Sequence, residues 1–185
     1  MLLDIGFLDD ATRPTVPPLT GLTPAQKASG EHLKEVHNHI RHELKSINLM
    51  IERAATGAAS AAEIADETQQ LALVANFRRF GNLCGQYCAL VNTHHSIEDY
   101  HMLPAIARVS DGYRLVADRL RAEHVVVHEL LERQIDALNA LAAEPTATRF
   151  DDARIVFEAL ERVLLSHLGY EEDQIGDALG YYELL

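Results

Sequence analysis

The chain is poor in several residue types, and each shortage excludes a class of protein. It has 185 residues, no Trp and only two Cys, so disulfides cannot staple the domain and a reducing, cytoplasmic location is expected. Lys and Arg number 16 against 28 Asp and Glu, and the resulting charge of −12 argues against a nucleic-acid partner. No apolar run approaches the roughly 20 residues that span a bilayer, so no membrane partner is expected. The opening segment Met1–Gly6 also lacks the basic and apolar parts of a signal peptide.

Signals for β-strands are missing as well. The single run of β-branched residues, Val125–Val127, lies inside a helical periodicity. The sequence instead predicts four long helices, at about 24–55, 61–103, 113–143 and 150–179. The capping-box signature Thr23–Gln26 opens the first helix, and Pro104 is expected to end the second.

The connections between these helices are short, and the first is expected at the Ala/Gly/Ser stretch 56–60. The predicted fold is therefore an all-α, antiparallel four-helix bundle over residues 23–185. Residues 1–22 contain three Pro and are expected to form an irregular N-terminal arm. Its apolar side chains are expected either to fold back on the bundle or to meet a second subunit, so a homodimer is one predicted assembly.

Each predicted helix carries an apolar stripe at spacings of three and four, and His or Glu interrupts the stripes near one level. In the third helix the stripe is Tyr113, Ala117, Leu120, His124, Val127/His128, Leu131, Ile135 and Leu138. The interrupting residues of all four helices are His37, His94, Glu98, His124, His128, His167 and Glu171. Buried without partners, such groups would cost several kcal/mol each, whereas a bound cation makes them favourable.

The spacing of these residues supports metal binding. His94 and Glu98, His124 and His128, and His167 and Glu171 form three pairs whose members are four residues apart. Side chains at i and i+4 share one helix face, so both members of a pair can reach the same ion. Seven ligands exceed the four of a tetrahedral zinc site and suit two octahedral ions that share the carboxylates.

The remaining histidines are assigned by their angle around the helix. His32, His39, His42 and His95 leave the apolar face and are expected to be exposed. His101 shares the face of Glu98 and is an eighth ligand or a supporting partner if it reaches the site at all. Glu172 is the alternative to Glu171 as the last ligand.

Taken in order, these residues resemble the hemerythrin-like (HHE cation-binding) family. The matching pieces are His37, then His94 to Glu98, then His124 and His128 as HxxxH, and finally His167 to Glu172. The last ligand differs from that of the oxygen carriers, which have Asp five residues after the His, and is more similar to actinobacterial hemerythrin-like proteins. The resemblance implies a centre of two iron ions bridged by both carboxylates and an oxo or hydroxo group, with manganese the less favoured metal.

The function that this resemblance implies is binding of O2 or a related small ligand, NO or peroxide. Five His would supply three ligands to one iron and two to the other, which leaves one open position. The alternative is an enzyme that turns over peroxide or NO, or that catalyses an oxidative step in a pathway. A third hypothesis, sensing through a partner, would use the arm, and deleting the arm should then leave metal loading intact. Cys84 and Cys88, four apart on one helix, are expected to be free thiols.

Overall fold

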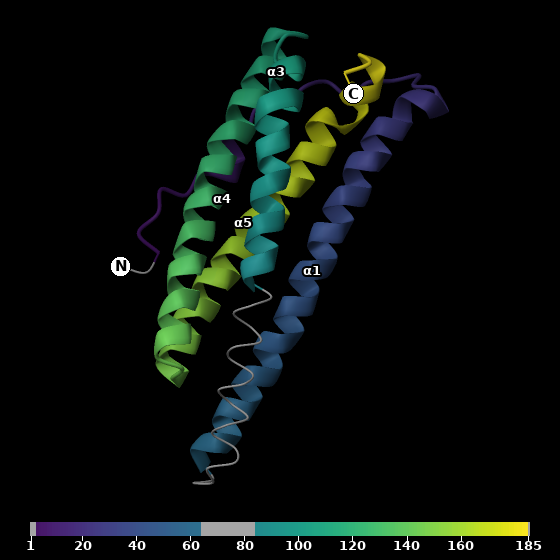
Figure 1. The fold of residues 1–185 in the computed structure, drawn as a ribbon. Helices are drawn as coiled ribbons and strands as arrows, with labels where there is room; N and C mark the ends of the chain where they lie inside the picture. The colour runs from purple at the N-terminus through teal and green to yellow at the C-terminus, as the bar shows by residue number, and fades with distance from the viewer. Residues whose placement is uncertain (1–2, 64–83, 185) are drawn as a thin grey trace.

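A computed structural model describes residues 3–63 and 84–184, and every long element among them is an α-helix. The longest are α1 (Pro24–Glu63), α4 (Asp111–Ala143) and α5 (Ala147–Tyr181). The helical segment 84–97 continues through the π-helix η2 (Glu98–Met102) into the short α3 (Leu103–Ile106). Consecutive helices run in opposite directions, and α5 packs against both α1 and α4 (Figure 1). The prediction of an all-α, antiparallel bundle is confirmed.

The first helix begins as predicted and ends later. Gln26 accepts from the Thr23 backbone N–H at 3.0 Å, and the Gln26 N–H donates to Thr23 Oγ1 at 3.3 Å, which is the reciprocal capping box. The predicted connection at 56–60 is wrong, because α1 continues to Glu63. Ala is the strongest helix former, and one Gly in such a stretch costs only about 1 kcal/mol. The part of the second predicted helix in residues 64–83 lies outside the described residues.

Pro104 does not end the second helix, contrary to the prediction, because the chain stays helical to Ile106. The Leu103 N–H bonds to the Glu98 carbonyl, five residues back, so the helix is wider than an α-helix just before the proline. Pro104 then sits in the first turn of α3, where its missing N–H is not needed.

The core is divided into two apolar clusters. The larger contains Ile40, Leu44, Ile47, Ile51, Cys84, Tyr87, Cys88, Val91, Val127, Leu130, Phe150, Phe157, Leu160 and Leu164, among others. The smaller contains Leu33, Met102, Leu103, Ile106, Tyr113, Val116, Ala117, Leu120, Tyr170, Ile175 and Leu179, among others. Both cysteines are free thiols, as predicted. Ile135, assigned to the apolar stripe, is 44% exposed and does not belong to the core.

The helices α1 and α5 touch backbone to backbone beside the smaller cluster. A Cβ at Gly30 would lie 2.7 Å from the carbonyl oxygen of Gly176, and one at Gly180 would overlap the carbonyl of Gln26. Only glycine permits this approach, because any side chain there would push the two helices apart. The contact lies less than three helical turns from the polar layer described below.

The arm folds back on the bundle, which was one of its two predicted positions. Leu3 and Ile5 pack against the larger cluster, and Val16 and Leu19 against the smaller one. Its one regular piece is a short 3-10 helix, Asp10–Thr12. In Figure 1 the arm starts beside α4 and reaches the beginning of α1 on the other side of the bundle. No helix within residues 3–63 and 84–184 combines the length and apolar character that a membrane crossing requires.

Candidate metal centre

A layer of buried polar side chains separates the two apolar clusters. Its fully buried imidazoles and carboxylates are His37, His95, Glu98, Glu123, His124, His167 and Glu171, and His94 lies at its edge. On each helix these residues fall between the members of the larger and the smaller cluster. The layer therefore lies at one level of the bundle, where all the helices contribute to it.

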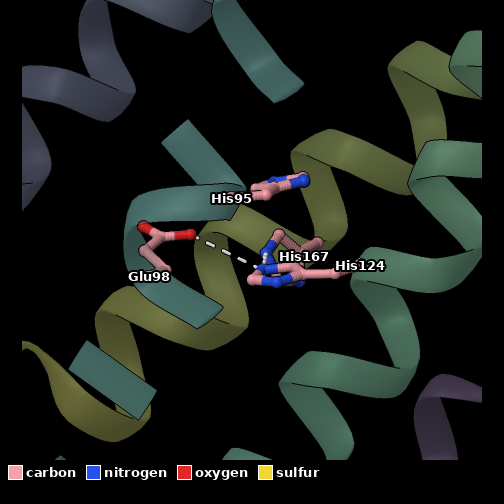
Figure 2. Close-up of side chains that lie close together, drawn as sticks. All are labelled: His95, Glu98, His124 and His167. Atoms are coloured by element: carbon pink, nitrogen blue, oxygen red, sulfur yellow. Dashed lines mark hydrogen bonds and ion pairs between the residues drawn. The ribbon is translucent and has the colours of Figure 1, made fainter. Parts of the chain in front are cut away.

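The potential ligand atoms of this layer gather in two groups, within each of which they lie no more than 4.8 Å apart. The three-histidine group consists of His95, Glu98, His124 and His167 (Figure 2). The two-histidine group consists of His37, His94, Glu98 and Glu171. Six of the seven predicted residues are brought together in this way, His95 joins them, and His128 lies outside both groups.

Glu98 belongs to both groups because its two oxygens face different histidines. Oε1 lies 3.0 Å from His94 Nε2, and Oε2 lies 3.5 Å from His124 Nε2. Glu171 is placed in a similar way, with Oε2 3.5 Å from His37 Nε2 and 3.7 Å from His167 Nε2. Both carboxylates thus lie near histidines of both groups, and Glu98 is a member of both.

The histidines point their Nε2 atoms at one another. His37 Nε2 is 3.1 Å from His94 Nε2, and the same distance separates the Nε2 atoms of His124 and His167. Burial lowers the pKa of His37 and of His167 to about 4, and burial with the neighbouring imidazoles lowers that of His94 to about 3. Neutral imidazoles are the form that binds a metal ion.

Three of these rings are oriented by a carboxylate at Nδ1. The pairs are His37 with Glu172 at 2.8 Å, His124 with Asp99 at 2.9 Å and His167 with Glu123 at 3.0 Å. Donation of the Nδ1 proton to a carboxylate leaves the lone pair on Nε2 and fixes the ring, as in most histidines that hold a metal. Glu172 also accepts from Arg41 at 2.7 Å, so it supports His37 while Glu171 lies in the two-histidine group.

Glu98 and Glu171 have histidine nitrogens near their oxygens but no hydrogen bond to them. None of the oxygens of Glu98 and Glu171 has a hydrogen bond, although both residues are at most 3% exposed. Burial raises the pKa of Glu171 to about 8, and burial with the nearby Glu171 charge raises that of Glu98. A cation between them would reverse this effect, because it stabilises the ionised form.

His95 is the residue that the sequence prediction missed. It was expected to be exposed, but its ring is fully buried and stacks on His124 with centroids 4.0 Å apart. At about 100° per residue, positions three and four before Glu98 lie about 60° and 40° to either side of it. His94 and His95 therefore flank Glu98, one in each group. The i, i+3 spacing of His95 and Glu98 is the signal that could have found it.

His128 and His101 lie outside both groups. The His128 ring is 6.5 Å from that of His124 and 5.6 Å from that of His95, and its buried Nε2 has no hydrogen bond. Its role as a ligand stays a prediction. His101 is exposed, so its assignment to the face of Glu98 is wrong: η2 winds more slowly than an α-helix and turns it to solvent. His32, His39 and His42 are exposed, as predicted.

The residues of this layer fit a metal centre better than an apolar core. Four carboxylate oxygens and both ring nitrogens of His95 are buried without hydrogen bonds, which would cost several kcal/mol in an ordinary interior. The same atoms, together with the converging Nε2 atoms, are the donors that a cation needs.

Comparison with known proteins supports this interpretation. A family model described as the hemerythrin HHE cation binding domain matches residues 28–179, which is most of the chain and includes every residue of both groups. No curated protein and no solved structure matches the chain. The narrower likeness to actinobacterial members stays a prediction.

Proposed function

The chain belongs to the hemerythrin HHE cation-binding family, and on this basis we propose that the buried layer holds two iron ions and binds O2, NO or peroxide. One ion occupies each group, Glu98 is shared between them, and Glu171 belongs to the two-histidine group. The observation that carries the proposal is the position of Glu98, whose two oxygens face histidines of different groups. A single ion would need only one of these groups.

The donor set favours iron over other metals. The two groups together offer five imidazoles and two carboxylates, more donors than a tetrahedral zinc site uses. Imidazole is a good ligand for iron, whereas manganese and magnesium prefer sites made of oxygen atoms. The resemblance noted for the sequence points to the same metal.

When bound, the iron pair supplies a redox-active site for a small oxidant. The protein contributes position and environment: the Nε2 atoms of four histidines face one another in pairs, and three of these four rings are oriented by a carboxylate at Nδ1. The apolar clusters above and below the layer exclude water and strengthen its electrostatic interactions.

The second candidate function is an enzyme that turns over peroxide or NO, or that carries out an oxidative step. The presence of both carboxylates in the two-histidine group favours it, because anionic ligands stabilise the more oxidised form of a metal. The two candidates share the same site and differ in whether the small ligand is released unchanged.

Metal content tests the proposal. Protein reconstituted with iron(II) without oxygen and desalted should carry about two irons per chain, as carboxylate-bridged sites in helix bundles do. His124→Ala should lower this number, because His124 Nε2 lies in the three-histidine group. His39→Ala is the matched control, because His39 is exposed on α1 and should leave the number unchanged. Zinc in preference to iron, or no metal, would contradict the proposal.

Exposure of the iron-loaded protein to oxygen separates the two candidate functions. An absorption change that reverses when oxygen is removed supports reversible binding. Consumption of many equivalents of peroxide or NO per chain supports the enzyme.

A further inference from the structure

The arm lies along α4 and α5 and is held there by several hydrogen bonds. They join Arg133 to the Asp4 carbonyl at 2.6 Å, Arg119 to the Asp9 carbonyl at 2.9 Å, Tyr170 to the Pro14 carbonyl at 2.7 Å and the Val16 N–H to Gln174 at 2.9 Å. The arm precedes residue 28, where the family match begins. What it does here is therefore a property of this chain and not of the matched domain.

Arg13 extends from the arm to side chains of α4 and α5. Its Nε donates to Glu123 Oε1 at 2.8 Å and its Nη2 to Glu123 Oε2 at 3.1 Å, so the guanidinium holds the carboxylate at two points. Nη1 donates to Ser166 at 2.9 Å, and the guanidinium lies 4.7 Å from the centre of the Tyr170 ring. The Arg13 side chain is only 14% exposed, and that of Glu123 is 5% exposed.

Glu123 connects Arg13 to the three-histidine group. Its Oε2 accepts from His167 Nδ1 at 3.0 Å, and His167 Nε2 points into the layer. Arg13 and Arg119 both donate to the Glu123 carboxylate, so it lies against two guanidinium groups. Its hold on the His167 ring is therefore a charge-assisted hydrogen bond.

We propose that Arg13 is a positioning residue for the metal centre, which acts through Glu123 to orient the His167 ring. The inference rests on the proposed function, because it requires His167 to bind a metal ion. The arm thereby completes the three-histidine group from outside the four helices.

Arg119 cannot replace Arg13 in this role. It donates to Glu123 through a single contact, Nε to Oε1 at 2.7 Å, and its other nitrogens bond to the arm. Oε2, the oxygen that accepts from His167, receives its second hydrogen bond from Arg13. Without Arg13 the carboxylate would keep only one guanidinium contact, that of Arg119 at Oε1, and Oε2 would be free to move together with the His167 ring.

The arm covers part of this side of the bundle and leaves a pocket beside these contacts. A cavity of about 230 Å³ lies between the arm and the helices α4 and α5. It is lined by Phe7, Leu8 and Asp10 from the arm, by Glu123 and Val126 from α4, and by Ser166 and its neighbours from α5. The helices do not fill this space themselves, so Glu123 is shielded from solvent in part by the arm.

The experiment is a titration of the full-length, metal-free protein with cobalt(II), followed by removal of the cobalt with a chelator. Arg13→Gln should bind cobalt but release one ion of the pair about ten times faster than wild type. Changing a residue that orients a metal ligand usually lowers metal affinity by about this factor or more. The visible absorption bands of cobalt should also change, because they report ligand geometry. Arg13→Lys should behave in between, because Lys keeps the charge and lacks the planar fork.

Gln174→Ala is the control. It removes an arm contact, the bond from the Val16 N–H, and does not touch Glu123. It should release cobalt at the wild-type rate with the wild-type spectrum. Circular dichroism and thermal unfolding of each metal-free variant identify any that does not fold, and Arg13→Lys provides the comparison if Arg13→Gln is one of them.

The outcomes separate the two levels of the proposal. Two cobalt ions in wild type with an unchanged release rate and spectrum in both Arg13 variants would overturn the positioning role and leave the proposed function standing. Equal effects of Gln174→Ala and Arg13→Gln would also overturn it, since docking of the arm alone would then be responsible. Failure of wild type to bind any cobalt would overturn the proposed function, and this inference with it.

Discussion

The two ligand groups share one residue and differ in charge. The three-histidine group has one carboxylate among four ligands, and the two-histidine group has two. With neutral imidazoles, the ligands carry about one negative charge on the first side and two on the second, if Glu98 is counted in both. The support differs too: two imidazoles of the first group have a carboxylate at Nδ1, against one of the second.

Because of this difference, we expect the two groups to hold a metal ion in different ways. More anionic ligands hold a cation more tightly, so the two-histidine group should keep its ion against a chelator for longer. The three-histidine group depends more on the direction of its rings, because neutral ligands gain less from charge alone. Variants that act on one group and not the other test this comparison.

The largest loss of bound iron is expected on substitution of Glu98, the residue that both groups share. Glu98→Gln removes the negative charge that the two groups share, so it should abolish metal binding at both, as measured by iron content after desalting. The metal-free variant should nevertheless unfold at a higher temperature than metal-free wild type, because Gln needs no proton to be buried in neutral form. Glu35→Gln, on the exposed side of α1, is the control and should change neither value. Retention of two irons in Glu98→Gln would mean that the groups do not share a ligand.

An intermediate effect is expected for His95. His95→Ala removes one imidazole of the three-histidine group and should lower iron content to about one per chain while the two-histidine group stays loaded. His128→Ala is the matched comparison, since His128 lies outside both groups and should retain two irons. The reverse result, loss of iron with His128→Ala alone, would support the predicted role of His128 as a ligand and make His95 a packing residue.

The smallest effect is expected on the stability of the metal-free protein, through Glu171, the carboxylate that only the two-histidine group contains. The folded pKa of Glu171 is about 8 and its ordinary value is 4.5, so between these values the unfolded chain has released a proton that the folded chain keeps. Stability is therefore lost as the pH rises through this window. Below about pH 6.5 the histidines act in the opposite direction, since their folded pKa values are lowered.

Between pH 7 and 8 the histidines are neutral in both states, and the carboxylate contribution remains. The free energy of unfolding of metal-free wild type should fall in this range, by at most about 1.4 kcal/mol per pH unit for one proton. Glu171→Gln should show a flatter dependence in urea unfolding at several pH values. An equally steep fall in the variant would show that another group releases the proton.

The sequence predicted the buried polar layer because the apolar periodicity of each helix indicates which of its residues face the core. His37, His124 and His167 occupy positions where an apolar residue would be expected, and the spacing of three and four placed them on the inward face. The pair His167 and Glu171 followed from the same rule. In a regular α-helix a constant angle per residue gives the face on which each residue lies, and α4 and α5 are regular where they pass through the layer.

The prediction of which histidines face the core was wrong in two cases: where the helix is not a regular α-helix, and where neighbouring residues of one helix both face the layer. His95 lies next to His94 in sequence, and a rule that allows one inward face per helix excludes it. The π-helix η2 begins at Glu98 and turns His101 outward, which a constant 100° per residue cannot describe.

The contacts of the arm could not be predicted from the sequence, for a different reason. Arg13 and Glu123 are 110 residues apart, and nothing in the local pattern of either one indicates the other. The sequence allowed the arm to fold back, as it does, but not the identification of the side chains that it contacts. Such long-range polar pairs depend on the packed bundle and cannot be read from periodicity.

The glycine contact between α1 and α5 has a consequence for protein engineering. Gly30 lies seven residues before His37, and Gly176 lies five after Glu171, so the contact sets how far one helix can slide along the other. Metal–ligand distances tolerate deviations of only about 0.2 Å. A designer who transfers the ligands to another bundle without this contact would copy the residues and lose their alignment, so the glycines belong to the minimal transferable unit.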